Sequence, residues 1–190
     1  MPDTIRAFIA IKLPEKITVS ISKIQEDLKS YGFNVKWVRP ENIHLTLKFL
    51  GNTDRADTEK VGSAISESVK TYAPLSLIAK GIGVFPNIKR PRVIWTGVAE
   101  QHNRLAGLQR HLDGHLESIG FPREKRPFKG HLTIGRVKQR MDSNRLMQAM
   151  KEYATFESGT FIVNEIVLFK SELHPTGAVY TQLMSASLKK

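Results

Sequence analysis

The chain has 190 residues, of which 41% are hydrophobic and 25% are charged, a composition typical of an ordinary globular protein. It contains no cysteine, which excludes a disulfide scaffold, thiolate metal sites and a cysteine nucleophile. Lys and Arg outnumber Asp and Glu by 29 to 18, a net charge of +11, so we expect a polyanionic partner, the alternative being a basic surface that serves only solubility.

The length of the chain fits one domain, residues 1–190, built from two lobes, because no stretch is long enough to be a linker. No run of 18 apolar residues occurs, and Met1-Pro2-Asp3-Thr4 leads directly into a strand pattern. We therefore expect neither a signal peptide nor a membrane span, and a cytosolic location.

In chain order, residues 5–13 alternate as a strand. Residues 15–31 carry apolar side chains every three or four positions, which predicts an amphipathic helix ended by Gly32. A short strand over residues 35–38 and a turn at residues 39–42 follow.

The next strand opens with His44-Leu45-Thr46-Leu47. Successive side chains of a strand point to opposite faces, so His44 and Thr46 share one face while the two leucines share the other. We expect the leucine face to lie in the core and the other face to offer an imidazole and a hydroxyl to solvent or substrate.

A second amphipathic helix follows, for which Asp54 or Asp57 can be the cap. Residues 75–85 and 92–98 then read as strands. Between them lies a basic loop with two prolines, residues 86–91, which either contacts a phosphate backbone or is a solvated turn.

The third predicted helix covers residues 101–119, and a connection follows at residues 120–128. A second copy of the earlier phrase, His131-Leu132-Thr133-Ile134, lies in a strand at about residues 130–137. Its His and Thr again share one face.

A fourth helix, capped by Asp142 or Ser143, is expected to end near residue 153. The chain then closes with two predicted strands, residues 160–171 and 179–185.

The repetition of the His-x-Thr phrase is more informative than either copy. A single such His is usually exposed or bonded to a carbonyl in the core. Two copies, one in each half of the chain, indicate a duplicated unit with one shared cleft.

The residues around both copies carry a resemblance to a known family. Residues 37–51 and 126–136 resemble the two-histidine phosphoesterases, and among these the RNA 2′,3′-cyclic phosphodiesterases, historically called 2′-5′ RNA ligases. Residues 6–11, 92–95 and 166–171 fit as well, so the resemblance covers nearly the whole chain. It implies an α+β fold of two pseudo-symmetric lobes, each an antiparallel sheet with helices outside, and an active-site cleft between them.

The chemistry of cyclic phosphate hydrolysis needs one group to take a proton from water and another to protonate the departing ribose oxygen, and imidazole serves either task. The residues alone permit either assignment. The resemblance implies that His44 is the proton donor and His131 the proton acceptor. Thr46 and Thr133 can donate hydrogen bonds to the phosphate oxygens.

Two further substrate contacts are implied by the resemblance. Arg136 would border the nucleotide, although strict alternation points it away from the cleft unless the strand bends at Gly135. Phe8 would stack on the terminal base, the alternative being that it packs in the core.

The remaining histidines suggest no metal site. His111 and His115 have the spacing of metal ligands on a helix, but Leu112 stands where the metalloprotease pattern has Glu, and no third ligand is evident. A phosphate-binding glycine loop is absent as well, so we expect neither a metal nor a cofactor, and no ATP-driven ligation.

The function we expect is metal-independent hydrolysis of RNA 2′,3′-cyclic phosphate ends to a 2′-phosphate by a monomer that does not bind membranes. Two alternatives stay open. One is a 2′-5′ RNA ligase that joins tRNA halves by the reverse reaction, and the other is a non-catalytic basic RNA-binding module.

Overall fold

The computed structural model describes residues 3–100 and 102–189. Its elements are strands and helices in the mixed order that an α+β fold requires, as expected. The helices are α1 (Glu15–Ser30), α2 (Thr58–Val69), α3 (Arg104–Glu117) and α4 (Ser143–Glu152), with short 3-10 turns η1 (Pro40–Asn42) and η2 (Arg55–Asp57). The strands are β1 (Thr4–Lys12), β2 (Val35–Trp37), β3 (His44–Asp54), β4 (Leu75–Phe85), β5 (Val93–Ala99), β6 (His131–Val137), β7 (Glu157–Val163), β8 (Glu165–His174) and β9 (Gly177–Ser187).

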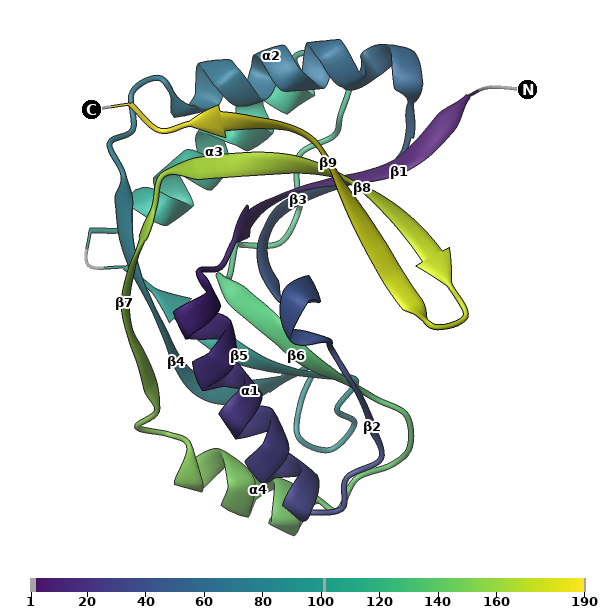
Figure 1. Ribbon diagram of the computed structural model, residues 1–190, viewed down its shortest axis with the longest axis vertical. Coiled ribbons are helices and arrows are strands. Elements are labelled where there is room, and N and C mark those ends of the chain that lie inside the picture. Colours follow the sequence, from purple (N-terminus) through teal and green to yellow (C-terminus); the bar gives the residue numbers. More distant parts are fainter. Residues whose placement is uncertain (1–2, 101, 190) are drawn as a thin grey trace.

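The strands form one antiparallel sheet in the order β7-β4-β5-β6-β3-β1-β8-β9, with β2 paired to β6. Its two halves meet at a single residue pair, Leu45 of β3 with Leu132 of β6. We call β3, β1, β8 and β9 the first half-sheet, and β6, β5, β4 and β7 the second half-sheet. Figure 1 shows them as two lobes, one above the other. The two expected antiparallel sheets are thus present, and the single pair makes them continuous.

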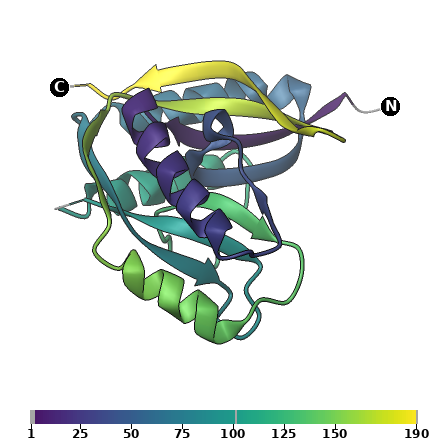
Figure 2. The same ribbon diagram turned by 60° about the horizontal axis from the view of Figure 1, so that its bottom comes forward.

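The two half-sheets are related by a pseudo-twofold axis between β3 and β6, because the strand order has equivalent members on either side of that junction. The helices that precede the motif strands, which we call the crossing helices, each follow a strand of one half-sheet but pack against elements of the other. The helix α1 follows β1 but packs beside β7, and α3 follows β5 but packs against α2 and β3. Figures 1 and 2 show α1 near α4, and α3 near α2.

Each crossing helix contacts a motif strand through one buried polar side chain. Gln25 of α1 donates from Nε2 to the backbone oxygen of Ile134, at 2.8 Å. Asp113 of α3 accepts from the Lys48 ammonium of β3, and both side chains are almost fully buried. Because buried polar groups need partners, these contacts determine where each crossing helix sits behind the strands that carry the His-x-Thr phrases.

One predicted element was wrong. Residues 160–171 were expected to be one strand, but the structure has β7 ending at Val163 and β8 beginning at Glu165. The strand β7 pairs with β4 in the second half-sheet, whereas β8 pairs with β1 in the first. Only Asn164 separates them, and neither Gly nor Pro marks the break, so the local pattern could not reveal that the chain crosses between lobes here.

The helix caps follow the expected chemistry in one case of two. Asp142 begins α4, and its Oδ1 accepts hydrogen bonds from the backbone N–H groups of Asn144 and Arg145. Asp57 precedes α2 without a side-chain hydrogen bond, and Asp54 instead caps η2.

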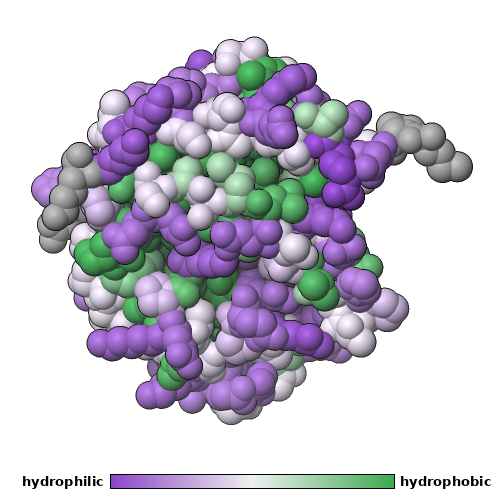
Figure 3. Space-filling model, turned by 45° about the horizontal axis from the view of Figure 1, so that its top comes forward, coloured by the Kyte–Doolittle hydropathy of each residue, from purple (hydrophilic) through white to green (hydrophobic). Residues whose placement is uncertain are grey.

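The core lies between the sheet and the helices, where the apolar faces predicted from the sequence are buried. Hydrophilic side chains cover much of the face drawn in Figure 3, with apolar patches among them. Among residues 3–100 and 102–189, no helix is both long and apolar enough to cross a membrane.

Candidate active site

The two motif strands have the same local structure. Over the first seven residues of β3 and of β6, buried and open positions follow an identical order. Each strand also has a register shift, or β-bulge, at the fourth residue of its phrase, so that one extra residue has no partner opposite. The extra residues are Leu47 in β3 and Ile134 in β6.

The bulges change which side chains reach the open face of the sheet. An extra residue reverses the alternation that follows it. The reversal places Phe49 of β3 and Arg136 of β6 on the same face as the histidines, and both are exposed. Strict alternation would point Arg136 away from the cleft. The bulge at Ile134 turns the Arg136 side chain toward the cleft, and it lies directly before Gly135, at which a bend was expected.

The single pair between β3 and β6 places the four motif side chains. Because Leu45 pairs with Leu132 in antiparallel register, His44 faces Thr133 across the junction and Thr46 faces His131. The two histidines therefore occupy one diagonal of a four-residue pattern, and the two threonines the other. Both histidines line the same cleft, one from each half-sheet, so a phosphate in the cleft can lie between them.

These four side chains share a cleft of about 390 Å³. Residues of both half-sheets line it: Arg6, Ala7, Phe8, Val38, Asn42, His44, Thr46, Phe49, Gly51, His131, Thr133, Arg136, Ser171, Leu173, Ala178 and Tyr180. All six site residues expected from the sequence are in this set. The cleft between the lobes is thus where the two halves of the chain meet.

Both imidazoles are held by the same backbone contact. Nδ1 of His44 lies 2.8 Å from the carbonyl oxygen of Asn42, and Nδ1 of His131 lies 2.7 Å from that of Lys129. A carbonyl oxygen only accepts, so each Nδ1 carries the hydrogen and donates it. The other ring nitrogen, Nε2, is then free on each histidine to take or give a proton.

Aromatic rings fix the orientation of each imidazole. His44 lies 4.8 Å from the ring centroid of Phe8 and 5.3 Å from that of Tyr180. His131 lies 5.0 Å from Phe85, edge to face. Burial lowers the pKa of His44 below its ordinary value; the bond to Asn42 opposes this, while the nearby positive charge of Arg136 lowers the pKa further.

The position of Phe8 favours core packing over base stacking. Its side chain is only 3% exposed, and it packs on Phe169 and Tyr180 as well as on His44. Phe49 is 62% exposed, with its ring centroid 6.1 Å from that of Phe8. An exposed ring at the cleft is the one that can stack on a base.

Sequence reasoning missed Phe49 and Tyr180 as cleft residues. Phe49 stands five positions after His44, as Arg136 stands five positions after His131. Aligning the two phrases could therefore have placed both on the same face. Tyr180 carried no such signal, because only the hairpin of β8 and β9 brings it over His44.

The histidines on α3 have no metal-site surroundings. His111 is exposed and its Nδ1 lies 3.1 Å from the Tyr72 hydroxyl. Within the part of the chain that the structure describes, no three His, Asp or Glu side chains converge as a metal-binding group.

Comparison with known proteins adds to this geometry. The model of the family described as "LigT like Phosphoesterase" matches residues 11–95 and 97–180. The chain is 38% identical to a Methanothermobacter thermautotrophicus protein named RNA 2′,3′-cyclic phosphodiesterase, over 94% of this chain and 96% of that one. A protein of the same name from Aquifex aeolicus is 37% identical, with 93% and 94% covered.

Solved structures have the same fold. The crystal structure of TT0787 from Thermus thermophilus superposes with a TM-score of 0.81 at 26% identity, covering 96% of this chain and 97% of that one. The apo form of E. coli LigT superposes with a TM-score of 0.78 at 22% identity, with 99% of each chain covered. Both alignments span both half-sheets and the cleft between them.

Proposed function

The chain belongs to the LigT-like phosphoesterases, and we propose that it is an RNA 2′,3′-cyclic phosphodiesterase that hydrolyses the cyclic phosphate to a 2′-phosphate. The observation that carries this proposal is the diagonal arrangement of two histidines and two threonines at the junction of β3 and β6. The names of the similar proteins support the same activity.

The proposed reaction begins with water approaching the phosphorus on the His131 side. Nε2 of His131 accepts a proton from the water as its oxygen bonds to phosphorus. The bond from phosphorus to the 3′ oxygen breaks, and Nε2–H of His44 protonates that oxygen. The 2′ oxygen keeps the phosphate, and solvent exchange then restores the proton on His44 and removes the one on His131.

The other cleft residues stabilise the phosphate in this scheme. The Thr46 and Thr133 hydroxyls donate to its non-bridging oxygens, where negative charge accumulates in the transition state. Arg136 supplies a positive charge for the phosphate or the adjoining nucleotide. The imidazoles and hydroxyls together provide proton transfer and charge stabilisation, so we propose that the reaction needs no metal.

The location of Phe49 supports a division of labour between two aromatic residues. Phe49, exposed at the cleft, is placed to stack on the terminal base. Phe8 lies beneath His44 and holds the imidazole. The alternative is that Phe8 stacks on the base, as the resemblance implies. Substituting Phe8 and Phe49 one at a time would show which of the two rings contacts the base.

The physiological setting is part of the proposal. All four motif side chains come from one chain, so a monomer has a complete site. We propose a cytosolic enzyme that acts on broken RNA, tRNA fragments among them, in line with the absence of cysteine and the net charge of +11. Sedimentation of the pure protein would detect a dimer, and cell fractionation would detect another location.

The test of the activity uses RNA that ends in a 2′,3′-cyclic phosphate, incubated with the protein in excess EDTA. We expect a 2′-phosphate product. His44→Ala and His131→Ala should each reduce kcat by about 10²–10⁴-fold, the usual contribution of a general acid or base, while RNA affinity is retained. His115→Ala, a change at an exposed histidine on α3, is the control and should have wild-type activity.

Other outcomes of the same assay contradict the proposal. Turnover that EDTA abolishes would show that a metal takes part. Joined RNA in excess over hydrolysed RNA at low RNA concentration would identify a ligase. An RNA end unchanged by wild-type protein that binds it would identify a non-catalytic RNA-binding module.

A further inference from the structure

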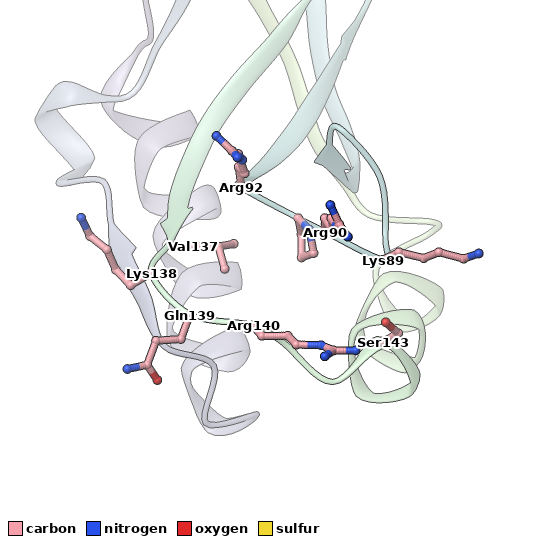
Figure 4. A pocket seen from close by; sticks show the side chains of 9 residues that line it. Lys89, Arg90, Arg92, Val137, Lys138, Gln139, Arg140 and Ser143 are labelled. Carbon is pink, nitrogen blue, oxygen red and sulfur yellow. The ribbon is translucent and has the colours of Figure 1, made fainter.

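A second cavity, larger than the cleft, lies at the opposite end of β6 from His131. Its volume is about 780 Å³. We call it the basic pocket, and its lining residues are Lys89, Arg90, Pro91, Arg92, Val137, Lys138, Gln139, Arg140 and Ser143. Five of these nine residues are cationic and none is acidic. Figure 4 shows Arg90, Arg92 and Arg140 around one opening, while Lys89 and Lys138 extend away from it on opposite sides.

The cations of the basic pocket have no carboxylate partner. Among residues 3–100 and 102–189, none of the five forms an ion pair, as is true of most Lys and Arg side chains in the described part of the chain. Asp142, beside Ser143, is occupied in capping α4. Cationic side chains around one opening attract an anion.

The backbone that carries these cations is anchored. The N–H of Arg92 donates to the Phe85 oxygen at 2.7 Å, and the Arg92 oxygen accepts from Val137 at 2.9 Å. The N–H of Arg90 donates to the Asn87 side chain at 3.1 Å. The loop between β4 and β5 is therefore held beside the end of β6, and the guanidinium groups of Arg90, Arg92 and Arg140 offer the forked donors that suit phosphate.

The cleft and the basic pocket are lined by successive residues of β6, whose side chains point to opposite faces of the strand. Arg136 lines the cleft, and the next residue, Val137, lines the basic pocket. Val137 is six positions along the strand from His131, which is about 20 Å. A phosphate in the basic pocket is therefore a different phosphate from the one that lies between the histidines.

We propose that the basic pocket is a second phosphate-binding site, which holds the backbone of the RNA strand several nucleotides away from its cyclic end. This inference rests on the proposed function, and it makes the preferred substrate an RNA strand rather than a single cyclic nucleotide. The predicted loop at residues 86–91 then contacts a phosphate backbone, the first of the two alternatives for it.

The test compares a nucleoside 2′,3′-cyclic phosphate with a dodecamer RNA that ends in the same group. In the double variant Arg90→Ala/Arg140→Ala we expect KM for the dodecamer to rise about tenfold and KM for the nucleotide to stay within twofold. The slope of log affinity for the dodecamer against log salt is negative, and it should become shallower by about 1.4, since each contact to single-stranded RNA contributes about −0.7.

The matched control removes two exposed cations that line neither cavity, Lys23 on α1 and Arg110 on α3. Lys23→Ala/Arg110→Ala should leave both KM values and the salt slope close to wild type. Equal effects of the two double variants on the dodecamer KM would show that the basic pocket acts only through the general charge of the surface, and would overturn the proposal. An unchanged dodecamer KM in Arg90→Ala/Arg140→Ala would overturn it as well.

Failure of the proposed activity would be recognised separately. If the wild-type protein opens neither substrate, the activity is wrong, and fluorescence anisotropy with the labelled dodecamer still decides the inference. A dodecamer affinity that falls in Arg90→Ala/Arg140→Ala but not in the control supports the second phosphate site. Equal affinity in all three proteins removes it.

Discussion

The two catalytic candidates share a backbone contact but differ in their surroundings. Each imidazole donates from Nδ1 to the carbonyl two residues earlier, which leaves Nε2 for chemistry. His44 is additionally packed between Phe8 and Tyr180, and this burial lowers its pKa. A bound phosphate anion acts in the other direction, because a nearby negative charge favours the imidazolium. In the free protein His44 therefore loses its proton readily, and a bound phosphate favours its protonated form.

The lowered pKa of His44 predicts the pH dependence of kcat/KM, which reports the free enzyme. As a proton donor, His44 must be protonated, and its protonated fraction decreases as pH rises through a pKa below the usual value of about 6.5. We expect kcat/KM to fall on that alkaline limb. A rise of kcat/KM through the same pKa would instead make His44 the proton acceptor.

The assignment of the alkaline decrease in kcat/KM to His44 can be checked by a measurement that needs no turnover. Arg136→Gln removes a positive charge that lowers the pKa of His44, so the NMR titration of the His44 ring should move to higher pH in the substrate-free protein. Lys23→Gln, on the outer side of α1, should leave the titration in place. An unmoved His44 titration in Arg136→Gln would contradict the electrostatic contact between these residues.

The two threonines are expected to act in the transition state rather than in binding. Thr46→Val and Thr133→Val keep the side-chain shape and remove only the donor. Loss of one such donor costs about 2.7–4 kcal/mol, or about 10²–10³ in kcat, with KM little changed. Thr160→Val, at an exposed position of β7, is the control. A change in KM alone would assign the hydroxyls to ground-state binding.

Among the elements, the crossing helices are joined to the motif strands through buried polar contacts. Behind β3, Lys48 pairs with Asp113 of α3 and also donates to the Pro122 oxygen at 2.6 Å. Asp113 Oδ2 accepts from the backbone N–H of Glu124 at 3.0 Å. One carboxylate therefore joins β3 to the connection that leads into β6. Behind β6, Gln25 of α1 contacts the backbone oxygen of Ile134.

Removing one partner of the buried pair should be more harmful than removing both. Asp113→Ala leaves the Lys48 ammonium buried without a counterion, and we expect the free energy of unfolding to decrease by about 3–5 kcal/mol. Lys48→Met/Asp113→Leu should recover much of that loss, because apolar groups of similar volume need no partner. Urea unfolding measures both. A double variant as unstable as Asp113→Ala would show that the ion pair itself is required.

In the whole molecule, the chain completes its first half-sheet with its last strands. The hairpin of β8 and β9 pairs with β1 and brings Tyr180 over His44. The turn region ahead of β3 holds the hairpin in place, since Arg39 donates to the Thr176 oxygen and Asn42 to the Ala178 oxygen. The cleft therefore forms only when both ends of the chain and its middle have come together.

The features that depend on near neighbours could be predicted from the sequence: the strand and helix periods, the face shared by each His and Thr, and a cap for α4 at Asp142 or Ser143. These follow because side-chain direction repeats every two residues in a strand and every 3.6 in a helix. The family resemblance added the two-lobed fold and the cleft between the lobes, which no local period contains.

Other features depend on how distant segments pack against one another. A bulge is a mismatch between two strands, so the positions of Arg136 and Phe49 depend on partners far along the chain. The same holds for the division of residues 157–174 into β7 and β8 and for the basic pocket, which the loop before β5 forms with the segment after β6. Each arises from contacts between distant segments, which the order of residues within one segment does not specify.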